Sequence, residues 1–330
     1  MLQKTLLLTT FLYFLTAVQG TSDACMDLMS TLSLENTTIL AAERISGGVT
    51  ISTPGSCQSE AFVTTDVCRV YGFVKTTASS AVHFEMWLPD DWFGRFLVTG
   101  NGGLGGCKLF FRLRELSLRA VSSSNNVIKG VDYSSLDYGN TLHFATIGSD
   151  NGHDGYSGAP FLNQPEVIND FAFRAVHVET VIGKQILNAY YNRTHDKSYF
   201  LGCSTGGRQG LQSASLYPDD FDGIISGAPA TDFNHLIGWL GMLGHSIGAP
   251  NPSTSKSFIP ASLWPIISEE IRNQCDELDG VKDGIITEPD DCAFDPKALL
   301  CDTTSDELHR PHAHGELEGE VSQDDLYAKI

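Results

Sequence analysis

A single serine stands between glycines in the stretch LGCSTG at residues 201–206, which contains the pattern G-x-S-x-G. An apolar, strand-like run (SYFLGCS) leads into this stretch, and a helix-like run from Thr205 to about Leu216 follows it. A sharp strand-to-helix turn strains the serine and lifts its hydroxyl clear of the sheet, while glycines leave room for neighbouring backbone. We therefore expect Ser204 to be a nucleophile and the Thr205 amide to stabilise an oxyanion. The pattern is short, and a glycine-rich turn without chemistry is the alternative.

A second glycine-rich stretch, TGNGGLGGC at residues 99–107, follows the strand-like run RFLV. In a serine hydrolase of this type the second oxyanion donor comes from an earlier strand-to-helix loop, so Gly102 and Gly103 are the candidates. A phosphate-binding loop is the alternative. The stretch contains neither GxxxxGK[ST] nor GxGxxG, which disfavours that interpretation.

The elements that must position these residues can be traced along the chain. Strand-like runs occur within residues 67–100, at 142–150, at 198–204 and at 221–230, and a helical apolar spacing extends from about Val167 to Tyr191. Strands separated by helices predict an α/β domain with a largely parallel sheet. After Ala230 this rhythm stops, and we expect a second, smaller region at 231–301 and a polar tail at 302–330.

The composition limits the possible partners. The chain has 330 residues and a net charge of −19, which disfavours binding to nucleic acid and to anionic lipid. Residues 1–20 combine Lys4 with a short apolar core, which predicts a secretory signal peptide cut after Gly20. A membrane anchor is the alternative, but the run is shorter than the roughly 20 apolar residues of a membrane-spanning helix. We therefore expect a secreted, extracellular protein.

The cysteines and sequons agree with secretion. Eight cysteines in an oxidising compartment predict disulfides, and sequence alone leaves their connectivity open. The sequons at Asn36 (Asn-Thr-Thr) and Asn192 (Asn-Arg-Thr) predict glycosylation.

Carboxylates cluster in the stretch CDELDGVKDGII at residues 275–286. Three carboxylates in a tight, glycine-containing turn repel one another unless a cation neutralises them, and hard oxygen donors suit Ca²⁺. The predicted ligands are the side chains of Asp276, Asp279 and Asp283 and the backbone carbonyls of Val281 and Ile285. A solvated acidic turn is the alternative.

These stretches resemble the tannase and feruloyl esterase family of secreted α/β-hydrolases. The resemblance extends from about Cys25 to about Asp302, and its most specific part is LGCSTGGRQGLQSASLYPDDFDGIISGAPA. GNGG at 100–103 looks like the oxyanion loop of the family, SDNGHDG at 149–155 like a loop near its active site, and the acidic turn like the structural calcium loop of its lid domain. Residues 21–230 would then form the catalytic domain and residues 231–301 part of the lid.

The resemblance implies a serine carboxylic ester hydrolase that works through an acyl-enzyme. The implied substrates are phenolic esters, namely feruloyl or cinnamoyl esters on plant cell-wall polysaccharide, or galloyl esters of tannins. It implies that Cys203 forms a disulfide clamp with a cysteine directly after the catalytic histidine. The other implied disulfides are Cys25–Cys68, Cys57–Cys107 and Cys275–Cys292.

The catalytic aspartate and histidine of the family follow the serine in the chain, yet no histidine after Ser204 precedes a cysteine. We therefore expect an N-terminal portion of such an esterase, without that aspartate and histidine, without the last core strands, and with Cys203 and Cys301 unpartnered. His153 precedes the serine, so we expect it to be structural or to face the substrate. A catalytically inactive secreted binding protein of the same fold, and a peptidase or lipase, are the rival functions.

Overall fold

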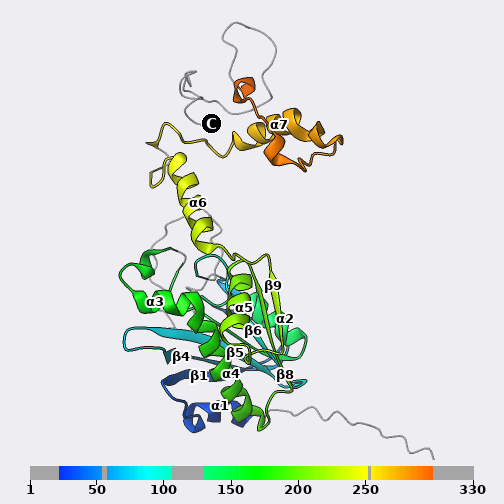
Figure 1. Cartoon of the computed structure of the whole chain (residues 1–330). Helices are drawn as coiled ribbons and strands as arrows, with labels where there is room; N and C mark the ends of the chain where they lie inside the picture. Colours follow the sequence, from blue (N-terminus) through cyan, green and yellow to red (C-terminus); the bar gives the residue numbers. More distant parts are fainter. Residues whose placement is uncertain (1–21, 54–57, 106–129, 156, 252–253, 300–330) are drawn as a thin grey trace, which may run out of the picture. The chain divides into compact units, whose positions relative to one another are not determined.

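The computed structural model describes residues 22–53, 58–105, 130–155, 157–251 and 254–299 (Figure 1). Internal contacts divide the chain into unit 1, which ends at Thr231, and unit 2, which begins at Asp232. Several predicted features lie outside the described residues. They are the signal peptide, the polar tail at 302–330, Cys301 and both cysteines of the Cys57–Cys107 pair.

Unit 1 is built on a mixed seven-stranded sheet in the order β1-β4-β5-β7-β6-β8-β9. The strands are β1 (Thr37–Ile45), β4 (Val67–Lys75), β5 (Ala81–Pro89), β6 (Arg95–Thr99), β7 (Phe144–Ser149), β8 (Lys197–Cys203) and β9 (Gly223–Gly227). From β7 to β9 the neighbours are parallel, whereas β1, β4, β5 and β7 pair antiparallel. The expectation of a largely parallel sheet is therefore right only for the half that contains the serine. The short connection at 76–80 between β4 and β5 fits a hairpin, because parallel neighbours need a longer crossover.

Helices cover both faces of this sheet (Figure 1). On one face α1 (Ser22–Thr31), α4 (Ala175–Tyr191) and α5 (Thr205–Leu216) bury a cluster that includes Phe84, Phe96 and Phe200. On the other face α2 (Tyr133–Thr141) and the hairpin of β2 (Val49–Ser52) and β3 (Glu60–Val63) bury a second cluster around Trp87. The disulfide Cys25–Cys68, implied by the family resemblance, is present and joins α1 to β4.

The helix expected over residues 167–191 is present but is interrupted near its start. It comprises the short helix α3 (Pro165–Asn169), a π-helical turn at 170–174, and α4, which ends where Asn192 adopts a left-handed φ of 49°. Apolar side chains at helical spacing, such as Ile182 and Ile186, face the sheet. The periodicity of the sequence reports this buried face but contains no signal for the π-helical turn.

The described part of unit 2 includes α6 (Phe233–Ser246), α7 (Trp264–Cys275) and short 3-10 turns at 276–279, 289–291 and 296–299. The disulfide Cys275–Cys292 closes the segment that contains the acidic turn, as the resemblance implies. In the described part of the chain no helix combines the length and the apolar character needed to cross a bilayer.

Candidate active site

Ser204 occupies the turn between β8 and α5 with φ 61° and ψ −116°. A positive φ is uncommon for a residue with a side chain and marks local strain. Backbone hydrogen bonds hold this conformation: the Ser204 N–H donates to the Gly227 carbonyl at 3.0 Å, and its carbonyl accepts from Arg208 and Ala230. The side chain is exposed. The structure thus has the strand, strained turn and helix that G-x-S-x-G predicts, with the hydroxyl accessible.

Glycines bring the loop at 99–105 directly against this turn. A Cβ added at Gly202 would lie 2.6 Å from the carbonyl of Gly206, and one added at Gly100 would lie 2.7 Å from the Gly206 Cα. Real side chains do not tolerate such distances, so a substitution at Gly100 would push the loop away from α5, and one at Gly202 would push β8 away from α5. The glycines of both motifs therefore act as spacers that set how closely the loop approaches Ser204.

Two buried side chains lock the loop to the helix that follows the serine. The Asn101 N–H donates to Gln209 Oε1 at 2.9 Å, and Gln209 Nε2 donates back to Asn101 Oδ1 at 3.1 Å. Asn101 Nδ2 also donates to the Ser149 carbonyl at the end of β7. Sequence reasoning missed this pair, because nothing in a single sequence signals a contact between positions 108 residues apart.

The candidate oxyanion donors lie on these two segments. Thr205 begins α5, where the first N–H groups of a helix have no helical partner and favour negative charge. The Thr205 hydroxyl donates to the Gly103 carbonyl at 2.6 Å, which ties the loop to the first residue of the helix. Gly102 is half-buried and Gly103 exposed. The structure therefore places Thr205, Gly102 and Gly103 on adjoining segments, and their role as donors stays a prediction.

No base is assigned to Ser204 in the described part of the chain. Its hydroxyl makes no hydrogen bond to a described residue. His153 is buried between Phe161 and Phe171, and its Nδ1 lies 3.5 Å from the Asn151 carbonyl. The two described histidines that follow the serine, His235 and His245, belong to unit 2, and the remaining three lie outside the described residues.

Cys203 is exposed and has no disulfide partner among the described residues. Its sulfur lies beside Gly227 of β9, 3.4 Å from the position that a Cβ there would take. The family resemblance implies a disulfide between Cys203 and a cysteine directly after the catalytic histidine, and no such cysteine is identified among the described residues.

Arg208, one turn after the serine, ties α5 to the π-helical turn. Its guanidinium donates to the carbonyls of Ala172 and Phe171 and lies over the Phe171 ring. Burial lowers the pKa of Arg208 from its ordinary value. The π-helical turn, which the sequence does not signal, therefore contacts the helix that follows Ser204.

The acidic turn of unit 2 is folded by its own carboxylates. Asp276, Asp279 and Asp283 accept the N–H groups of Gly284, Val281 and Ile285, at 2.8, 2.9 and 3.0 Å respectively. Within the described residues no three carboxylate, imidazole or thiol groups gather closely enough to hold a metal ion. Calcium binding would thus require these side chains to turn toward a common point, and the ion stays a prediction.

Comparisons with known proteins extend over most of the chain. A family model described as tannase and feruloyl esterase matches residues 68–316. Proteins named probable feruloyl esterase B from Aspergillus clavatus and probable feruloyl esterase B-2 from Aspergillus flavus are 42% and 44% identical, over 281 and 264 residues. These matches cover 84% and 78% of this chain but 48% and 46% of the relatives. The chain therefore spans about half the length of the curated relatives it matches.

Solved structures agree with this assignment. Feruloyl esterase B from Aspergillus oryzae is 36% identical with a TM-score of 0.69, covering 86% of this chain and 52% of that one. Tannin acyl hydrolase from Aspergillus niger, 22% identical with a TM-score of 0.50 over 85% of this chain and 49% of that one, shares the fold alone. From the family match, the relatives and the sheet of unit 1, the chain belongs to the tannase and feruloyl esterase family and has the fold of α/β-hydrolase esterases.

Proposed function

We propose that this chain supplies the nucleophile of a carboxylic ester hydrolase, and that Ser204 is this nucleophile. The observation that carries the proposal is the strained, exposed serine between β8 and α5, with the glycine loop packed against it. The Ser204 oxygen attacks the ester carbonyl, the alcohol leaves, and water then hydrolyses the acyl-enzyme. The amides of Thr205 and of Gly102 or Gly103 stabilise the tetrahedral oxyanion.

The proposed substrates are feruloyl or related cinnamoyl esters, such as those on plant cell-wall polysaccharide. The two relatives at 42% and 44% identity are named probable feruloyl esterases. The tannin acyl hydrolase shares only the fold at 22% identity, so galloyl esters have weaker support.

Hydrolysis of a chromogenic feruloyl ester by the secreted full chain tests this function. Turnover requires a base from outside the described residues; where turnover occurs, Ser204→Ala should reduce it by at least about a thousandfold, because the acyl-enzyme cannot form without the hydroxyl. Circular dichroism of both proteins controls for folding. Turnover that is equal in the Ser204→Ala protein contradicts the proposal. A folded chain that binds the ester without turnover supports the binding protein instead. A panel that adds galloyl esters then ranks the acyl groups.

We also propose that the protein is secreted and binds one structural Ca²⁺ in the acidic turn. The N-terminal sequence and the two observed disulfides support secretion. For calcium the support is the chemistry of the donors, since oxygen ligands in a flexible turn suit this ion. The ligands would be Asp276, Asp279, Asp283 and the carbonyls of Val281 and Ile285.

A further inference from the structure

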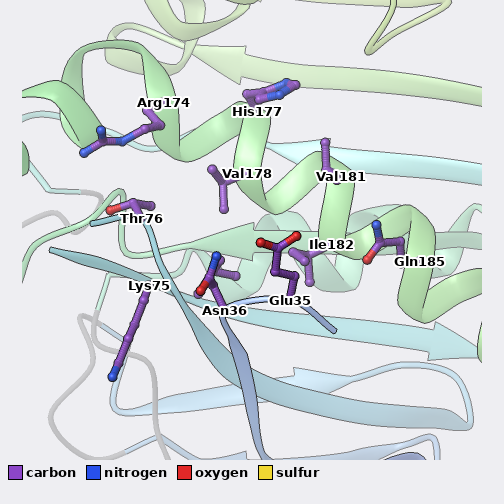
Figure 2. Close-up of a pocket in the computed structure, with 11 residues that line it drawn as sticks. Glu35, Asn36, Lys75, Thr76, Arg174, His177, Val178, Val181, Ile182 and Gln185 are labelled. Atoms are coloured by element: carbon purple, nitrogen blue, oxygen red, sulfur yellow. The ribbon is translucent and has the colours of Figure 1, made fainter. Parts of the chain in front are cut away.

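Unit 1 contains a pocket of about 320 Å³ that none of the active-site residues lines (Figure 2). Its walls are the turn before β1, the end of β4 and one face of α4. Asn36, the asparagine of the first sequon, is one of the lining residues.

Asn36 is placed for modification. Its side chain is exposed, and so is Thr38, the hydroxyl residue that completes the sequon on β1. The Asn36 backbone adopts a left-handed φ of 54°, and its carbonyl accepts the Lys75 N–H at 2.8 Å. A turn fixed in this way holds the Asn36 side chain among the residues that line the pocket, as Figure 2 shows.

The charges around the pocket disfavour an anionic occupant. Arg174 is paired with Glu166 at 2.9 Å and with Asp170 at 2.5 Å, and His177 is paired with Asp220 at 2.8 Å. Lys75 points away from the pocket in Figure 2. The basic groups are thus already paired or turned outward, and the Glu35 carboxylate adds negative charge, which leaves little attraction for an anion.

The remaining walls suit a sugar ring. Val178, Val181 and Ile182 of α4 form an apolar surface, and Val181 is 37% exposed although it is apolar. Glu35 and Gln185 provide polar groups at the edge. A sugar has C–H groups on its ring faces and hydroxyl or acetamide groups at its edges, which matches an apolar wall with a few polar groups.

We propose that Asn36 carries an N-linked glycan whose first sugar, N-acetylglucosamine, occupies this pocket and packs on α4. The linkage forms when Asn36 Nδ2 attacks C1 of a lipid-linked oligosaccharide diphosphate: the C1–N bond forms, the C1–O bond breaks, the lipid diphosphate leaves and the amide loses one proton. Because the tether is only one asparagine side chain, the first ring must lie close to the lining residues. The proposal rests on the proposed secretion but not on catalysis.

The second sequon provides a matched control. Asn192 is exposed at the C-terminal end of α4, also with a left-handed φ, here 49°. It does not line the pocket. A glycan at Asn192 shares the compartment and the sugar chemistry, but not the cavity.

The test compares variants of the secreted full chain by glycopeptide mass spectrometry and by thermal unfolding. Thr38→Ala removes the first sequon and keeps Asn36, whose backbone conformation Gln would disturb. Thr38→Ser keeps the sequon. Thr194→Ala removes the second. We expect Thr38→Ala to lower the Tm by roughly 2–4 °C, the shift for the loss of one modest contact in a domain of this size. Thr38→Ser and Thr194→Ala should change it by clearly less.

Enzymatic trimming locates the stabilising part of the glycan. An endoglycosidase that leaves one N-acetylglucosamine on Asn36 should preserve the Tm, and Val181→Ser should reduce the difference between glycosylated and Thr38→Ala protein. An unmodified Asn36 beside a modified Asn192 overturns the proposal. Equal Tm values for the Thr38→Ala and Thr38→Ser proteins also overturn it. Because mass and Tm are the readouts, the result does not depend on esterase activity.

Discussion

Glu179 is a carboxyl group with no exposed surface, on α4 beside Ser149 and Asp150. Burial raises its pKa well above the ordinary value, and neither of its carboxyl oxygens has a hydrogen-bond partner among the described residues. A carboxyl whose pKa is higher in the folded than in the unfolded protein favours folding while it is protonated. That contribution is lost as the pH rises from the unfolded pKa, about 4.3, toward the folded pKa.

The Glu179→Gln variant tests this effect, because the amide keeps the shape of the protonated acid and does not ionise. We expect little difference in the free energy of unfolding at pH 4. Above that, the variant should gain over the wild type by about 1.4 kcal/mol per pH unit until the folded pKa is reached. Urea unfolding at pH 4, 6 and 8 measures the difference, and a constant offset at all three values contradicts the assignment.

At the scale of elements, the active site depends on how the loop after β6 is held against α5. The reciprocal hydrogen bonds of Asn101 and Gln209 are the buried connection between these segments. Removing the Asn101 side chain leaves Gln209 Nε2 without this partner, and removing the Gln209 side chain leaves the backbone N–H and Oδ1 of Asn101 without theirs. Each loss costs about 1–3 kcal/mol.

A double-mutant cycle with Asn101→Ala and Gln209→Ala measures this connection. We expect each single variant to lose about 1–3 kcal/mol of unfolding free energy and the double variant to lose less than the sum. Chemical denaturation provides the four values. Additivity within about 0.5 kcal/mol would show that the two side chains act separately.

The sequence predicts these elements well where buried residues recur at a regular spacing. It predicts less well the strand pairings and contacts between residues that are far apart in the sequence. The strands β4 to β9, the helix after Ser204 and the turn between them follow from apolar runs, helical spacing and glycines. The antiparallel half of the sheet was not predicted, because a strand's pattern does not report the direction of its neighbour. The contact of Asn101 with Gln209 was missed for a related reason, since it depends on tertiary structure alone.

For the whole molecule, the two units differ in how they are stabilised. Unit 1 has an apolar cluster on each face of its sheet. In the described part of unit 2 only Cys275 and Asp276 are buried, and α6 exposes Trp239 and Met242. A unit with so little buried apolar surface depends on covalent and ionic crosslinks. The Cys275–Cys292 disulfide is one, and the proposed calcium ion is a second.

Tryptic cleavage after Lys282, an exposed residue inside the acidic turn, reports directly on this ion. At a calcium concentration one hundred times the Kd, cleavage that requires the turn to open should slow about a hundredfold. Asp283→Asn retains an oxygen for the Ile285 N–H but loses the charge, so it should abolish the protection. Cleavage after the exposed Lys197 of unit 1, which lies outside both sequons, should not change with calcium. Equal rates at Lys282 with calcium and with a chelator would show that the carboxylates form a solvated turn that binds no calcium.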